Sequence, residues 1–483
     1  MKKGLKEKII RVFIQIITLH AILLVSSVAS AQSSWSLQDC IDHALENNLD
    51  IRQQKLNEER AAENVLQSYS MTLPTLSAGT SYGLNFGRSI DEVTNEFFTE
   101  RIASQRLMAT SSFHLFAGFR TINNIRLNLA RQTALRYDTE SLENDLILTI
   151  ANAYLQILYF EDMVEAARQQ VEISTQQVER TRALFEGGTV SRGDLLEVEA
   201  MAAEEEVRLT SMTNNLKLSY LELIYLLELD PDKEFAIMKP PLDVEDAQLM
   251  HDPDVIVEKA LNTEPSVSAA RERISVAENG LAVTRGQRWP TLTLNTALGT
   301  AYSEAYKRMA ENNNINTLAA GINGMSPDPG TIKNGGMPDL EIVPYSEQLS
   351  ENYYRSIQLS LSIPIFNHFS ARNNIQHARI DLEQARIDHE RTRNNLSRVV
   401  YQAHADAVAA FQDYVSNQKA LDAAQESFQY SEQGFALGLV SPLEYNEART
   451  RLNRAEINAI QSMYEFVFKT KILEFYQGEG FVL

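Results

Sequence analysis

Four stretches of the chain alternate between apolar and polar side chains. In residues 75–87, Leu76 and Tyr82 fall on one parity, whereas Ser77 and Asn85 fall on the other. The same alternation covers residues 107–115, 291–302 and 356–365. A period of two indicates strands with one apolar and one polar face, and each stretch has roughly the ten residues that a tilted strand needs to cross a bilayer. The pattern predicts transmembrane strands, with a soluble half-buried sheet as the alternative.

Between the strands, the apolar residues follow helical repeats. Residues 119–186 contain no proline or glycine, and apolar residues recur every seven positions from Ile150 to Phe185, with mostly small residues three positions on. This is the heptad pattern of a coiled coil. A glycine pair ends the segment, and a second heptad pattern fills residues 191–229. We expect a hairpin of two long antiparallel helices with its tip near residues 187–193.

Shorter helices are expected before the strands. Helical patterns cover residues 36–47, 49–71, 254–262 and 265–288. The second and fourth of these stop at Leu73-Pro74 and at Trp289-Pro290, as helices do before proline. Each pair of short helices therefore leads directly into a strand.

The order of elements occurs twice. The second long helix, expected over residues 369–437, has heptad residues such as Val400 at 250 positions after their partners such as Ile150. The turn sequence Gly438-Leu-Val-Ser follows Gly188-Thr-Val-Ser by the same spacing. Such regularity indicates an internal duplication. The expected organisation is a first repeat at residues 32–229, a linker at 230–253, a second repeat at 254–477 with its tip near 437–443, and a short tail at 478–483.

The two halves differ mainly in the segment between their strands. Residues 88–106 are polar and are expected to form a loop in the first half. Residues 303–353 are rich in Asn, Gly, Pro and Met, and are expected to form a much longer exposed loop in the second half.

The N-terminus has the three parts of a secretory signal peptide. Five bases lie within the first eleven residues, an apolar run follows from Ile9 to Val28, and Ala29-Ser30-Ala31 is a small-residue cleavage site. Residues 1–31 are therefore predicted to be removed on export, the alternative being an uncleaved membrane anchor. No later apolar run approaches the length of a membrane-spanning helix.

Charge and cysteine content exclude several classes of function. The net charge is -20, which disfavours nucleic-acid binding. The single cysteine, Cys40, excludes an internal disulfide and a cysteine-rich metal site. His377, His389 and His404 are too far apart on one helix to share an ion, and no motif of an enzyme or phosphate site is present. We therefore expect no catalytic residue, no cofactor and no metal.

The strands and helices together require an assembly. Four strands cannot close a barrel, and open strand edges are not tolerated in lipid. At least two chains must therefore share one barrel. A barrel in lipid joined to long helices is a conduit rather than a catalytic cleft.

The mature chain resembles the TolC-like family of outer-membrane efflux and export channels. The resemblance rests on the duplicated order of elements, on the two turn sequences, and on the strand entries Leu73-Pro-Thr-Leu and Trp289-Pro-Thr-Leu. It implies an α+β fold in a homotrimer, in which four strands from each chain form a 12-stranded barrel in outer-membrane lipid above an α-helical barrel in the periplasm. It also implies docking of the tips onto a periplasmic adaptor (membrane fusion protein) and an inner-membrane transporter.

This resemblance favours a passive outer-membrane channel of a tripartite efflux pump. The outer-membrane component of a type I protein secretion system is the first alternative. A periplasmic helical adaptor is an alternative of a different class, and the strands and the duplication disfavour it.

Two sets of tip residues are candidates for function. Asp194 and Glu444 lie at capping-box positions after Ser191 and Ser441, so helix capping explains them without a further role. Glu197 and Glu447 lie one turn on and are not needed as caps. By resemblance, Glu444 and Glu447 match acids that line the closed periplasmic end of the tunnel, where threefold symmetry would make carboxylate rings.

The residues expected to dock the adaptor are Gly188, Val190, Ser191, Gly438, Val440 and Ser441. Packing between the two turns is the alternative for the two valines.

Overall fold

The computed structural model describes residues 34–99, 101–232, 235–241, 252–309 and 340–481. The predicted signal peptide, and the central parts of the linker at 230–253 and the loop at 303–353, lie outside these ranges. The chain divides into two compact units. One unit joins the residues up to Arg60 with Gln132–Ile274 and Ala385–Leu483, and the other joins Ala61–Arg131 with Ser275–Gln384. Each unit therefore contains parts of both sequence repeats.

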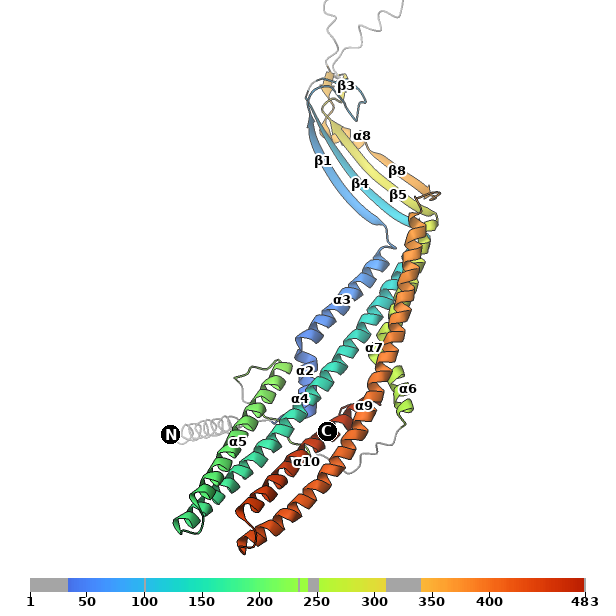
Figure 1. Cartoon of the computed structure of the whole chain (residues 1–483). Coiled ribbons are helices and arrows are strands. Elements are labelled where there is room, and N and C mark those ends of the chain that lie inside the picture. Colours follow the sequence, from blue (N-terminus) through green and yellow to red (C-terminus); the bar gives the residue numbers. More distant parts are fainter. Residues whose placement is uncertain (1–33, 100, 233–234, 242–251, 310–339, 482–483) are drawn as a thin grey trace, which may run out of the picture. The chain divides into compact units, whose positions relative to one another are not determined.

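The helices confirm the duplicated plan (Figure 1). The first half contains α2 (Leu37–Asn47), α3 (Leu49–Ser70), α4 (Arg120–Glu186) and α5 (Arg192–Leu226). The second half contains α6 (Pro253–Thr263), α7 (Pro265–Arg285), a 3-10 turn η1 (Gly286–Arg288), α9 (Ser370–Ala436) and α10 (Pro442–Tyr476). Helices α4 and α9 both have 67 residues, and α5 and α10 both have 35. The two hairpins thus have the same dimensions.

The heptad residues form the core of the helical unit. Ile150, Ile157 and the neighbouring Tyr154 are buried on α4, where they pack with residues of α2, α5 and α10. The small heptad residues Ala153 and Ala167 are also buried, as their spacing predicts. A second cluster joins α6 and α7 to α9 and α10 around Val400 and Ala407. The seam predicted from the sequence is therefore the packed face of the hairpins.

The four predicted strands form one antiparallel sheet. They are β1 (Thr75–Asn85), β4 (Ile102–Phe116), β5 (Thr291–Ser303) and β8 (Tyr354–Ser362), in the order β1-β4-β5-β8. Cross-strand partners such as Ala78↔Ala109, Ala109↔Leu298 and Leu294↔Leu359 join the apolar parities.

Because of this register, all four apolar sets lie on the same face of the sheet. The other face is polar. On it, the hydroxyl of Ser112 donates a hydrogen bond to Asn295 Oδ1 (2.9 Å) and His114 Nδ1 lies 3.1 Å from Thr293 Oγ1. Among the described residues, no helix combines the length and the low charge that crossing a lipid bilayer requires.

The segments between the strands are more ordered than predicted. Residues 102–106 belong to β4, and a two-residue ladder joins β2 (Ser89–Ile90) to β3 (Phe97–Phe98), so the expectation of a plain loop over 88–106 was wrong. In the described parts of 303–353, β6 (Lys307–Met309) pairs with β7 (Leu340–Ile342), and α8 (Tyr345–Glu351) follows. The expectation of one long exposed loop needs the same correction.

Hydrogen bonds between distant residues explain this order. Buried Gln348 of α8 accepts from the amide of Ser303 (2.8 Å) and donates to the carbonyl of Ser303 (3.0 Å), as a neighbouring strand would. The hydroxyl of Ser303 donates to buried Asp91, which also accepts from the amides of Val93 and Thr94. The loops of the two halves are therefore joined into one hydrogen-bonded structure at the end of the sheet.

Candidate functional site

The two hairpin tips have the same backbone. Gly188 and Gly438 adopt left-handed conformations, with φ of 76° and 72°. The backbone amide that follows each glycine donates a hydrogen bond to a carbonyl in the last turn of the long helix. Thr189 donates to Leu184 O and Leu439 donates to Gly434 O, both at 2.9 Å. This is the hydrogen bonding of a Schellman-type helix end, in which the left-handed position favours glycine. The tip glycines are therefore required for the turn whatever else they do.

The predicted capping boxes are present at both tips. The Ser191 hydroxyl accepts from the amide of Asp194 (3.2 Å), and the Asp194 carboxylate accepts from the amide of Ser191 (2.8 Å). Ser441 and Glu444 make the same reciprocal pair at 3.3 and 2.9 Å. The hydrogen bonds from Ser441 hold the pKa of the Glu444 carboxyl below its usual value. Asp194 and Glu444 are thus engaged in starting the return helices.

The acids one turn on are exposed. Glu197 and Glu447 both point into solvent in the described chain. Glu447 lies 3.9 Å from Arg451, an exposed pair that contributes little. The carboxylate of Glu447 is therefore available for another interaction.

The tip valines are less exposed than expected. Val190 and Val440 are half-buried, and Val440 packs on Gly434 so closely that a Cβ at Gly434 would lie 2.6 Å from the valine Cγ2. Packing within its own hairpin therefore explains the presence of an apolar side chain at position 440. The exposure of Val440 does not mark it as a docking residue. The sequence reasoning missed the flanking Leu437 and Leu439, which are 74% and 79% exposed.

The second hairpin contains an aromatic stack below its tip. The ring of Tyr445 on α10 lies between Phe428 and Phe435 on α9, with centroid distances of 5.5 and 4.8 Å. Arg180 of α4 places its guanidinium 5.4 Å from the centre of the Phe435 ring. A cation–π contact of this kind connects the first hairpin to the second.

A polar contact joins the same two hairpins further from the tips. Arg449 of α10 is half-buried, and its guanidinium donates to the Ser174 hydroxyl (2.8 Å) and to the Gln170 carbonyl (3.4 Å) on α4. Burial lowers the pKa of Arg449. Nearby on α5, Glu205 accepts from Asn453 of α10 at 3.3 Å. The sequence analysis did not select these residues, because a heptad pattern assigns faces within one helix but not contacts between hairpins.

The chain matches the family described as Outer membrane efflux protein over residues 40–227 and 256–467. The two matched segments correspond to the two halves of the duplicated fold. The chain belongs to this family. It is therefore an outer-membrane efflux channel protein whose tunnel lies in the periplasm, and the family assignment decides against the helical-adaptor alternative.

Relatives with curated descriptions are distant but extensive. The outer membrane protein TolC of Escherichia coli is 21% identical over 456 residues, which cover 92% of this chain and 82% of TolC. The probable efflux pump outer membrane protein TtgC of Pseudomonas putida is 20% identical over 445 residues, covering 89% and 82% of the two chains. The match to TolC of Vibrio cholerae, at 24% identity over 279 residues, spans 56% of this chain and 59% of that protein.

Solved structures support the fold over nearly the whole chain. A structure of CusC has a TM-score of 0.73 at 16% identity and covers 92% of both chains. The outer membrane protein VceC of Vibrio cholerae has a TM-score of 0.70 at 14% identity, covering 92% of this chain and 96% of VceC. At these identities the likeness establishes the fold.

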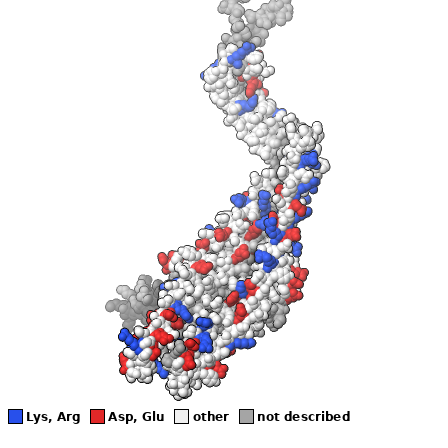
Figure 2. All heavy atoms as spheres, viewed as in Figure 1, with Lys and Arg blue, Asp and Glu red and all other residues white. Residues whose placement is uncertain are grey.

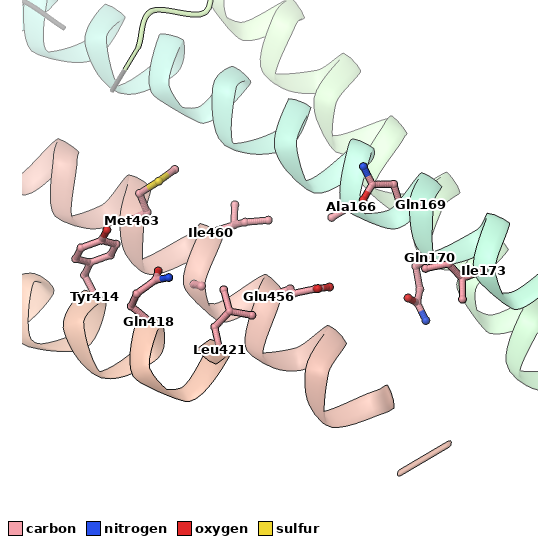
Figure 3. Close-up of a pocket in the computed structure, with 11 residues that line it drawn as sticks. Ala166, Gln169, Gln170, Ile173, Tyr414, Gln418, Leu421, Glu456, Ile460 and Met463 are labelled. Carbon is pink, nitrogen blue, oxygen red and sulfur yellow. The ribbon is translucent and has the colours of Figure 1, made fainter. Parts of the chain in front are cut away.

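In this channel protein the hairpins are not packed continuously against each other. An open cavity of about 360 Å³ lies between α4, α9 and α10 (Figure 3). Its lining combines apolar Ile173 and Ile460 with polar Gln418 and Glu456, and burial raises the pKa of Glu456. Within the described ranges, no three His, Cys, Asp or Glu side chains could hold a metal ion together.

Proposed function

We propose that the protein is a homotrimeric channel that passively exports substrates delivered by a periplasmic adaptor and an inner-membrane transporter. The observation that carries the shared barrel is the open sheet, and the number of three chains follows the resemblance to the TolC-like family. Strands β1 and β8 lie at the two ends of the strand order, so each has one neighbour within the described sheet. In lipid, the other edge of each strand must find a partner.

The exposed apolar face supports placing this sheet in lipid. Leu76 of β1 and Ile357 of β8 are each 81% exposed in the single chain, and their neighbours of the same parity are exposed as well. A soluble protein does not leave such a face in water. Pairing β1 of one chain with β8 of the next closes the sheet into a barrel of 12 strands around a threefold axis.

The hairpin tips are the proposed docking site for the adaptor. The candidate residues are Gly188, Val190, Ser191, Gly438, Val440 and Ser441, to which the structure adds the exposed Leu437 and Leu439. Exposed leucines at the end of a long hairpin suit a contact with the apolar tip of a second hairpin protein. The acids Asp194, Glu197, Glu444 and Glu447 are proposed to make the tunnel end selective for cations.

The outer-membrane component of a type I protein secretion system remains the second candidate. It would use the same barrel, tunnel and tips, and would differ in the transporter that delivers the substrate. The names of the relatives favour efflux, since TtgC is described as a probable efflux pump component.

In-cell photo-crosslinking tests this proposal. A photoreactive amino acid is placed at Leu439 or Val440, and the captured proteins are identified by mass spectrometry. A matched control has the same amino acid at exposed Leu218 on α5. Capture of an adaptor with a proton-driven exchanger from the tip sites supports efflux, and capture with an ATP-driven transporter supports secretion. Tip sites that capture no more adaptor than Leu218 would contradict the docking proposal.

A further inference from the structure

Both halves of the chain pass from strand to helix through an unusual turn. After β4, Gly118 and Phe119 adopt left-handed conformations with φ of 63° and 61°, and after β8, His368 and Phe369 do so with φ of 51° and 60°. Residues other than glycine avoid this region because Cβ approaches the backbone. Two bulky aromatic residues hold this conformation at equivalent positions, which indicates that the strained turn has a function.

The turns hold aromatic rings at the end of the sheet. Phe116 and Phe119 pack edge to face at 5.2 Å, and Phe366 and Phe369 repeat this contact at 5.5 Å. Trp289 adds a further edge-to-face contact with Phe119 at 6.2 Å. Despite these contacts, more than half of the surface of Phe119, Phe369 and Trp289 is exposed. Exposed aromatic rings between an apolar sheet face and a polar helix are typical of a membrane–water interface.

The turn after β8 borders a cavity with two arginines. The cavity of about 340 Å³ is lined by Arg288, Ile365, Phe366, Phe369 and Arg372, among others. Ile365, which is 95% exposed, has the same parity as the apolar residues of β8. The cavity therefore lies where the apolar face of the sheet ends.

The two arginines come from different elements and are held together. Arg288 ends η1 and Arg372 lies in the first turn of α9. The side-chain amide of Asn374 donates to Gln287 Oε1 (3.1 Å), which fixes η1 against α9. Neither arginine has an acidic side chain within ion-pair distance in the described part of the chain. Figure 2 shows several Lys and Arg, with some Asp and Glu among them, over the upper part of the helices below the sheet, whereas the adjoining part of the sheet is almost uncharged.

We propose that this cavity binds the anionic headgroup of a phospholipid in the periplasmic leaflet of the outer membrane. The planar guanidinium groups of Arg288 and Arg372 suit bidentate hydrogen bonds to phosphate oxygens. The rings of Phe366 and Phe369 lie at the level of the glycerol backbone, and the acyl chains continue along Ile365 onto the apolar face. The two arginines thus match the headgroup of one lipid molecule, and the apolar surface matches its acyl chains. A free anion or a soluble protein would not use both surfaces together.

Native mass spectrometry of the purified, assembled protein tests the site. The protein is titrated with phosphatidylglycerol and, separately, with zwitterionic phosphatidylcholine. The wild type should prefer phosphatidylglycerol, and the double variant Arg288→Gln/Arg372→Gln should lose this preference, with affinity falling about fivefold for each arginine. The double variant Arg288→Lys/Arg372→Lys keeps the charges and should lose less.

A matched control and a competitor separate the alternatives. Arg391 is an exposed arginine elsewhere on α9, paired with Asp388, so Arg391→Gln should leave lipid binding unchanged. Equal binding by the wild type and the Arg288→Gln/Arg372→Gln variant would overturn the proposal. Displacement of the lipid by inorganic phosphate alone would also overturn it, in favour of a free-anion site. If the glutamine variant instead failed to assemble while its chains still bound the lipid, the cavity would be a contact between copies.

Discussion

The first hairpin, α4 with α5, and the second, α9 with α10, share a backbone but differ in what their side chains contact. Their helices have equal lengths, and their tips share the left-handed glycine and the serine cap. At equivalent positions, Glu199 of the first hairpin pairs with Arg182 of its own hairpin at 2.8 Å, whereas Arg449 of the second reaches across to α4. The two halves therefore share one backbone. Different side chains at equivalent positions give the second hairpin its contacts with the first.

The largest expected difference between the hairpins concerns Arg449. Arg449→Ala removes hydrogen bonds from a half-buried guanidinium to α4, and we expect it to lower the free energy of unfolding by about 2 kcal/mol. The control Glu199→Ala removes an exposed ion pair and should cost less than about 1 kcal/mol. Urea unfolding in detergent, followed by far-ultraviolet circular dichroism, measures both. Equal losses in the two variants would mean that the cross-hairpin contact adds nothing.

A smaller difference is expected at the acids one turn from each tip. If the second hairpin lines the tunnel end, Glu447→Ala removes a ring of carboxylates and should reduce the preference of the reconstituted pore for cations. The matched variant Glu197→Ala on the first hairpin should reduce it less, because by resemblance it is Glu444 and Glu447 that match the acids lining the tunnel end. Reversal potentials in a salt gradient report this preference. A shift for Glu197→Ala alone would assign the lumen to the first hairpin instead.

The sequence predicted the element boundaries well where local chemistry sets them. The ends of α4 and α9 follow from Gly187 and Leu437-Gly438, and the starts of the return helices follow from their serine caps. The end of α5 was placed too late, at Leu229, because the left-handed position after it is occupied by Glu228 (φ 53°) rather than by glycine. The equivalent position in the second half is Gly478, where the usual signal is present.

Contacts between residues far apart in the chain were not predictable. Asp91 and Ser303 are 212 residues apart, and each has an ordinary loop sequence around it. The same holds for Arg449 and Ser174, which are 275 residues apart. A periodic pattern fixes which face of an element is buried, whereas the partner of a polar side chain depends on how distant elements meet. The turn of each hairpin lies where the sequence placed it, whereas the exposure of the individual side chains at the turn did not follow from the pattern.

The central claim is that the open sheet closes into a ring of three chains through β1 and β8, and disulfide crosslinking tests it most directly. The single native cysteine does not interfere, because Cys40 is buried and burial raises the pKa of its thiol to about 12. Ser81→Cys on the polar face of β1 is combined in turn with Ser356→Cys, Gln358→Cys or Ser360→Cys on the polar face of β8. For the variant that matches the register, oxidised outer membranes should give crosslinked species up to trimers and none larger on a non-reducing gel. Crosslinked dimers alone, or no crosslink from any β8 position, would contradict the trimeric channel.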